Sequence, residues 1–404
     1  MAPLSRILSA ETAAAHQGLT HALLRSYAFL LAVNTVVGAG LFGVTDNGSL
    51  SNSYPTEVTP AGWTFAIWGT YEGAACPRAA DLRARGLLDL GQVVSRAVAA
   101  QTYVCTAEAP FQPDDATLVA GRAPSNTGAA CQADANHRRC HSLRHCAVRL
   151  LFSGSCGLHH CSRDARASLF IVADLSTVRR VPLGPIFLLQ GGGTAFYALG
   201  GAADAGRAAA IGAPWLLTWM LENSWQGCFL TAPMPPASAT RGRKLATSLP
   251  CAALLVGAHA AMMAAALNLR GSSTAVAASP LGALLVDFAT GLNAGWLAAA
   301  SGIGISLAAS HAPTTAIRRL AEPRGAGWLL AALGTYGGCA SAYLASSPHS
   351  LCVGAGYAAA TAWACRGILG RQALAPQVAR SARFGIRAVL VGLAAGALKA
   401  FSKR

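Results

Sequence analysis

The sequence is poor in charged residues, and in acidic residues above all. Only 12% of its 404 residues are charged, and 31 lysines and arginines stand against 16 aspartates and glutamates. Soluble domains carry about 25% charged residues, so this scarcity argues against an ordinary water-soluble protein. A basic excess also suits nucleic-acid binding, but here the arginines lie between apolar stretches instead of on one basic face. We therefore expect no nucleic-acid partner.

Catalytic motifs are also missing from the sequence. It contains no GxSxG, HExxH or phosphate-binding Walker motif, which are the short signatures of common hydrolases and nucleotide-binding enzymes. We expect no enzymatic activity and no cofactor. Residues 1–26 show no cleavable signal pattern, but they are rich in Ala, Ser and Thr, which leaves a short tail and an organellar transit peptide as alternatives.

Long apolar runs are abundant. Hydrophobic residues make up 53% of the chain, in runs of about 20 residues separated by short polar breaks, as in membrane helices. We predict an all-α fold: a polytopic membrane helix bundle of about seven transmembrane helices with a poorly ordered insert. The expected spans are 27–44, a second that begins at Trp63 and resumes at 186–201, then 211–229, 249–269, 281–309, 327–345 and 351–369.

Composition divides the chain into five segments. These are an N-terminal tail (1–26), the first membrane helix with its loop and the start of the second helix (27–72), a Cys/His/Arg-rich insert (73–184), the remaining bundle (185–369) and a basic C-terminal segment (370–404). In the last of these, the apolar stretch 384–401 fits either an amphipathic surface helix or a partial eighth span.

The insert holds 7 of the 12 cysteines and 5 of the 10 histidines. Their spacing fits no standard zinc finger, so we expect no metal. A disulfide-bonded insert, a disordered segment and a retained intron remain as alternatives. The last would join Gly69 and Thr70 directly to Ile186 in one apolar helix.

Basic residues predict the orientation in the membrane. They cluster in the loops after the third, fifth and seventh spans, whereas Arg25, Arg207 and Arg270 stand nearly alone on the other side. The more basic side faces the cytosol or its organellar equivalent, which places the N-terminus outside. We expect an integral, multi-pass membrane protein of a plastid, a mitochondrion or the endomembrane system.

One stretch, Thr59-Pro-Ala-Gly-Trp-Thr-Phe-Ala-Ile-Trp-Gly-Thr70, organises this interpretation. Pro60 and Gly62 interrupt any preceding element, so we predict a new helix that begins at Trp63. Trp63 and Trp68 enclose an apolar run. They fit either an aromatic anchor at the membrane interface or a ligand-contacting helix start.

This stretch resembles the start of the second membrane helix in the TspO/MBR family, the tryptophan-rich sensory proteins and translocator proteins. It is most similar to a longer, divergent branch of that family. The run Glu222-Asn223-Ser224-Trp225-Gln226 resembles the family's third helix, and Gly295-Trp296 resembles the fifth helix of the branch. The resemblance covers 27–70 and 186–369 and leaves the insert unmatched.

The resemblance implies a protein that binds, and transports or senses, a flat apolar ligand such as a tetrapyrrole or a sterol-like molecule. Its partners would be the lipid bilayer and this ligand, and a homodimer is allowed. An aromatic-lined pocket with a few polar groups suits such a ligand. We expect Trp63 or Trp68 to lie near Asn223, Trp225 or Trp296, and the expected ligand-binding residues are Trp63, Trp68, Asn34, Asn223, Trp225 and Trp296.

Two other functions stay open. Glu222 and Asp287 are acids within apolar sequence, where such residues mark ion pathways, so the chain could be a transporter or channel. Glu222 could also lie near the end of its span and reach water, and Asn34 could either join two helices or contact the ligand. The family resemblance also permits tetrapyrrole breakdown at the tryptophans.

Overall fold

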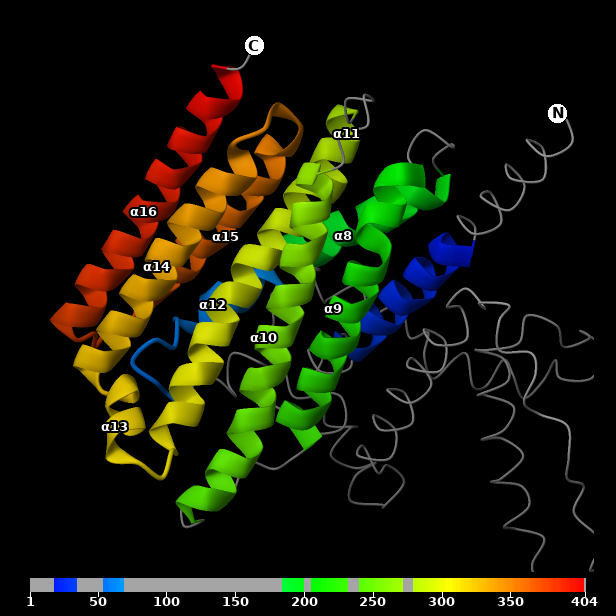
Figure 1. Ribbon diagram of the computed structural model, residues 1–404. Coiled ribbons are helices and arrows are strands. Elements are labelled where there is room, and N and C mark those ends of the chain that lie inside the picture. Colours follow the sequence, from blue (N-terminus) through cyan, green and yellow to red (C-terminus); the bar gives the residue numbers. More distant parts are fainter. Residues whose placement is uncertain are drawn as a thin grey trace, which may run out of the picture. The chain divides into compact units, whose positions relative to one another are not determined.

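The computed structural model describes residues 18–34, 54–68, 184–199, 205–231, 240–271 and 279–402. They all fall in one compact unit of the chain. These residues form helices and connecting turns without a β-strand, so the predicted all-α class is confirmed for them (Figure 1). Except for Gly184, the expected insert lies outside the described residues, as do 1–17 and the end of the first expected span.

Two groups of helices make up the described fold. The N-terminal group comprises a helix over residues 18–34, a 3₁₀ helix η2 (Gly62–Ile67), α8 (Pro185–Leu199), α9 (Ala205–Thr231) and α10 (Arg241–Gly271). The C-terminal group comprises α11 (Pro280–Gly282), the π-helical turn η5 (Ala283–Phe288), α12 (Ala289–Ser310), α13 (Thr315–Arg318), η6 (Arg319–Ala321), α14 (Pro323–Ala345), η7 (Pro348–Ser350), α15 (Leu351–Leu369) and α16 (Pro376–Phe401). The first helix therefore begins before Tyr27, the expected start.

Three of the described helices are long and apolar enough to cross a membrane. They are α10, the continuous rod Pro280–Ser310 formed by α11, η5 and α12, and α16. These helices support the expectation of a membrane protein. The expected number of seven spans stays a prediction. The C-terminal apolar stretch is part of a 26-residue helix that begins at Pro376, so by length and composition it matches a full span better than a partial one.

The second span does not begin as an α-helix at Trp63. Residues Gly62–Ile67 form a single stretch of 3₁₀ helix, and α8 then begins at Pro185, a residue suited to a first helical turn. The amide of Gly184 donates a hydrogen bond of 2.9 Å to the carbonyl oxygen of Trp68. Trp68 and Gly184, which flank residues 69–183, are therefore direct neighbours.

Helix α15 holds the segment that contains η2. The amide of Ala61 donates to the carbonyl oxygen of Gly367 at 3.0 Å, and the indole of Trp363 donates to the carbonyl oxygen of Thr64 at 2.9 Å. Arg371, just after α15, donates to the carbonyl oxygens of Thr56 and Glu57 at 2.7 and 3.2 Å. The C-terminal helices thus position the tryptophan-containing stretch.

Small residues allow the C-terminal helices to pack closely. Helices α14, α15 and α16 lie side by side, with α12 next to α15 (Figure 1). A Cβ atom added at Gly334 of α14 would lie 2.7 Å from the Cα of Gly385 on α16, and one at Gly338 would lie 2.8 Å from the carbonyl oxygen of Ala388. Backbones this close need glycine, as at many membrane helix interfaces.

Candidate functional site

Three elements bring four aromatic rings together. Trp68, directly after η2, has its ring centroid 5.8 Å from that of Trp225 on α9 and 5.6 Å from that of Trp296 on α12. Phe65 packs edge-on against Trp296 at 5.9 Å. We call these four residues the tryptophan cluster. Edge-to-face and tilted contacts at these distances are the favourable geometries for aromatic pairs.

A small cavity lies against the tryptophan cluster. Its volume is about 60 Å³. Besides the four rings, it is lined by small or apolar side chains of α10 and α12: Ser248, Cys251, Leu255, Ala300, Ile303, Gly304 and Leu307. The α10 residues gave no signal in the sequence, because one apolar helix face looks like another.

Two indole N–H groups at this cavity have no acceptor within the described part of the chain. They belong to Trp68 and Trp296. By contrast, the buried Trp215 donates to the hydroxyl of Thr290 at 3.2 Å. A buried donor without a partner costs about 1–3 kcal/mol, so the cavity favours an occupant that carries a hydrogen-bond acceptor.

Trp63 is placed apart from the tryptophan cluster. Its side chain is 45% exposed, and its ring packs edge-on against Trp363 of α15 at a centroid distance of 5.0 Å. Of the two tryptophans in the motif, only Trp68 joins Trp225 and Trp296. The position of Trp63 fits the aromatic-anchor interpretation.

A second group of buried side chains is polar. Glu222 is only 4% exposed, which argues against the alternative that it reaches water. It accepts a hydrogen bond of 3.2 Å from the amide of Asn293. The amide of Gln226 donates to the side-chain oxygen of Asn34 at 2.6 Å, which joins the first helix to α9. Asn223 is buried on the same stretch of α9.

These polar residues lie one helical turn from the tryptophan cluster. Glu222 precedes Trp225 by three positions on α9, and Asn293 precedes Trp296 by three on α12. Residues three apart share a helix face. Along both α9 and α12, a polar residue is therefore followed by a tryptophan one turn later on the same face.

Asp287 is neutralised within the fold. It lies in the π-helical turn η5, is 1% exposed and forms an ion pair with Arg207 of α9. The sequence placed Arg207 in a loop at the membrane surface; it is instead buried, because its charge compensates the acid. The two acids thus differ, since Asp287 has a cationic partner and Glu222 has none among the described residues.

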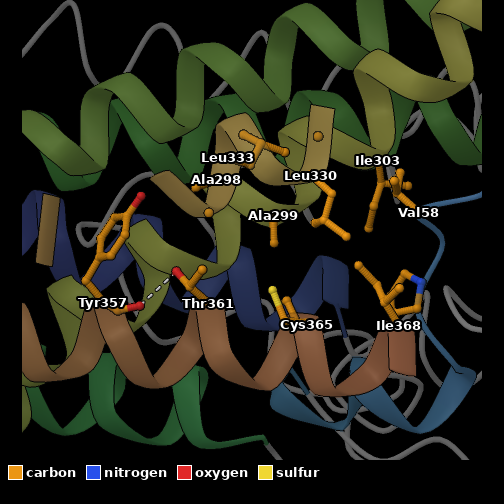
Figure 2. Close-up of a pocket in the computed structure, with 14 residues that line it drawn as sticks. Val58, Ala298, Ala299, Ile303, Leu330, Leu333, Tyr357, Thr361, Cys365 and Ile368 are labelled. Carbon is orange, nitrogen blue, oxygen red and sulfur yellow. Dashed lines mark hydrogen bonds between the residues drawn. The ribbon is translucent and has the colours of Figure 1, made fainter. Parts of the chain in front are cut away.

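A second, smaller cavity lies between α12, α14 and α15, with a volume of about 30 Å³ (Figure 2). Its walls are almost entirely apolar and include Val58, Leu330, Cys365 and Ile368. Apolar voids of this size stay dry and hold no drug-sized ligand. The larger cavity at the tryptophan cluster is therefore the better candidate site.

The described fold is that of a helical membrane protein with an aromatic cavity. Residues 20–71 match the family model of TSPO-like proteins, which supports membership of a TspO/MBR-related family. The match includes the first helix, η2 and Trp68. No curated protein and no solved structure matches the chain.

Proposed function

We propose that this membrane protein binds a flat apolar ligand, a tetrapyrrole or a sterol-like molecule, at the tryptophan cluster. The observation that carries the proposal is the convergence of Trp68, Trp225 and Trp296 around one cavity. Aromatic walls with a few polar groups suit a planar apolar ligand.

The indole donors narrow the ligand class. Trp68 and Trp296 both line the cavity, and both have an N–H group without an acceptor among the described residues. A ligand with a carboxylate, carbonyl or hydroxyl oxygen supplies the missing acceptor. A tetrapyrrole with carboxylate side chains meets this requirement as well as the apolar one.

The size of the cavity predicts a rearrangement on binding. It measures about 60 Å³, whereas sites for drug-sized ligands measure about 300–1,000 Å³. Side chains of α10 and α12 must therefore move apart before a tetrapyrrole fits. The free energy of this opening lowers the affinity relative to a preformed site.

Titration of the purified full chain with protoporphyrin IX tests the proposal. We expect saturable quenching of tryptophan fluorescence at micromolar or lower concentration, which corresponds to roughly −8 kcal/mol or better. Variants are compared through the absorbance change of the porphyrin, because this signal does not depend on how many tryptophans remain.

Four matched substitutions locate the binding site. Trp68→Phe and Trp225→Phe should weaken binding, since each removes part of the aromatic wall. Trp63→Phe and Trp215→Phe change tryptophans outside the cluster and should leave porphyrin binding unaltered. Linear, non-saturating quenching equal to that in empty detergent micelles would contradict the proposal, whereas a time-dependent loss of porphyrin absorbance favours the enzymatic alternative.

A further inference from the structure

Glu222 is a buried carboxylate, and no described cation lies beside it. One of its oxygens, Oε1, accepts the hydrogen bond from Asn293, and the other, Oε2, has no partner within the described residues. The described ion pair in the bundle joins Arg207 to Asp287 instead. An isolated carboxylate away from water is costly by several kcal/mol unless something neutralises it.

Two further buried side-chain oxygens, on residues next to Glu222 in the bundle, have no donor among the described residues. They are Oε1 of Gln226, one turn later on α9, and Oδ1 of Asn293 on α12. The amide nitrogens of both residues are engaged, with Asn34 and with Glu222 respectively. The nitrogen of Asn34 donates to the carbonyl oxygen of Leu30 at 2.9 Å, so its oxygen faces the nitrogen of Gln226, and a charged Glu222 requires the nitrogen of Asn293 to face it. Each of these three acceptors can be satisfied only by a donor or a cation.

We propose that Glu222, Gln226 and Asn293 form a site for a small monovalent cation inside the bundle, either a proton held by the carboxyl group or an alkali-metal ion. A single positive charge neutralises the single carboxylate. Carboxylate and amide oxygens are the ligands that hard cations prefer. This proposal does not depend on ligand binding at the tryptophan cluster.

Other titratable groups lie along α9 and on the elements that pack against it. Within the described residues, Glu222 makes its polar contact with Asn293. His259 of α10 comes near through the carbonyl oxygen of Ala294, which its Nδ1 contacts at 3.0 Å. The remaining groups are Tyr27 on the first helix, Tyr197 on α8, Arg207 and Cys228 on α9 itself, Cys251 on α10 and Asp287 in η5. A response to pH is therefore assigned to Glu222 only as the difference between the wild type and a Glu222 variant.

Thermal unfolding of the full chain in lipid nanodiscs tests the proposal. A cation that binds only the folded state raises Tm as its concentration exceeds Kd. Tm is measured with sodium or potassium against choline at constant ionic strength, and separately across a pH series in choline. In the wild type we expect a rise of Tm with at least one of the three cations: sodium, potassium or the proton.

Glu222→Gln keeps the shape of the side chain and removes the charge. It should abolish the cation-dependent part of the Tm response, and Gln226→Met should weaken the apparent affinity by about tenfold, the effect of losing about 1.4 kcal/mol. Glu322→Gln, at an exposed acid before α14, should change neither the cation-dependent Tm response nor the apparent affinity.

The outcomes separate the two forms of the cation. A Glu222-dependent response to sodium or potassium supports an alkali-metal ion, and one to pH alone supports a proton. If the wild type and Glu222→Gln respond equally to all three cations, or the wild type responds to none, the site does not exist. Gln226→Met gives the same decision if Glu222→Gln fails to fold.

Discussion

The ion pair between Arg207 and Asp287 allows a stability prediction with a definite magnitude. Asp287→Asn removes one charge and leaves the guanidinium of Arg207 without its partner. Removing one member of a buried pair costs about 3–5 kcal/mol. Because the side chain of Arg207 is 11% exposed and that of Asp287 only 1%, the remaining charge is not fully enclosed, and we expect a value near the lower limit, about 3 kcal/mol.

This loss corresponds to a decrease in Tm of about 6–12 °C, at about 2–4 °C per kcal/mol for a chain of moderate size. The assay is thermal unfolding in detergent micelles, followed by the circular dichroism of the helices. The double variant Arg207→Met/Asp287→Leu removes both charges and fills the space with apolar atoms. It should recover most of the loss, since such replacements are often neutral or stabilising.

An exposed arginine serves as the control. Arg324→Gln, in the first turn of α14, should change Tm by less than about 2 °C, as is usual for surface substitutions. If Asp287→Asn behaves like Arg324→Gln, the pair does not stabilise the bundle. If the double variant is as unstable as Asp287→Asn or more so, the loss comes from packing and not from an uncompensated charge.

Two further predictions concern the C-terminal helices. Gly338→Leu should lower stability by about 1–3 kcal/mol or more, because its Cβ would lie 2.8 Å from the carbonyl oxygen of Ala388. Limited proteolysis should then cleave α16 faster, whereas Gly242→Ala, with no atom within 4 Å of the added Cβ, should leave α16 as resistant as before. Arg371→Met removes the hydrogen bonds to the carbonyl oxygens of Thr56 and Glu57. Amide hydrogen exchange should become faster in this loop and stay unchanged in α10, and equal rates in the loop before and after the substitution would exclude this anchoring role.

Composition and apolar run length were sufficient to predict the helical class. These signals are local, because each helix must present apolar side chains over its own length. The meeting of Trp68 with Trp225 and Trp296 could not come from them, since the three rings lie on separate elements. It followed from the family resemblance, which carries information about tertiary structure.

The burial of Arg207 and the different positions of Trp63 and Trp68 could not be predicted from local sequence patterns. Arg207 stands at the start of an apolar run, where the positive-inside rule counts it as a surface charge. Only its partner Asp287, 80 positions later, shows why it is buried. Trp63 and Trp68 also looked equivalent in the motif, but the 3₁₀ geometry of η2 directs Trp63 towards Trp363 and Trp68 towards the core.

The hydrogen bond between Gly184 and Trp68 leads to a final prediction, about residues 71–183. These two residues are in direct contact although 115 positions, 69–183, separate them in the sequence. If 71–183 are deleted, Gly69 and Thr70 alone connect Trp68 to Gly184. The same hydrogen bond then joins a carbonyl to the amide three positions later, which is the spacing of a β-turn or a 3₁₀ helix.

The shortened chain should therefore fold with η2 and α8 in place. We expect the same cooperative unfolding in detergent and the same protoporphyrin IX affinity as the full chain. Deletion of 69–183 is the matched control, because it joins Trp68 directly to Gly184 and makes this hydrogen bond impossible. If Tm and ligand affinity decrease equally in both shortened chains, Gly69 and Thr70 are not sufficient to connect Trp68 to Gly184. Suppose that Tm and protoporphyrin IX affinity are retained only when Gly69 and Thr70 are kept. The tryptophan cluster then forms without any contribution from residues 71–183.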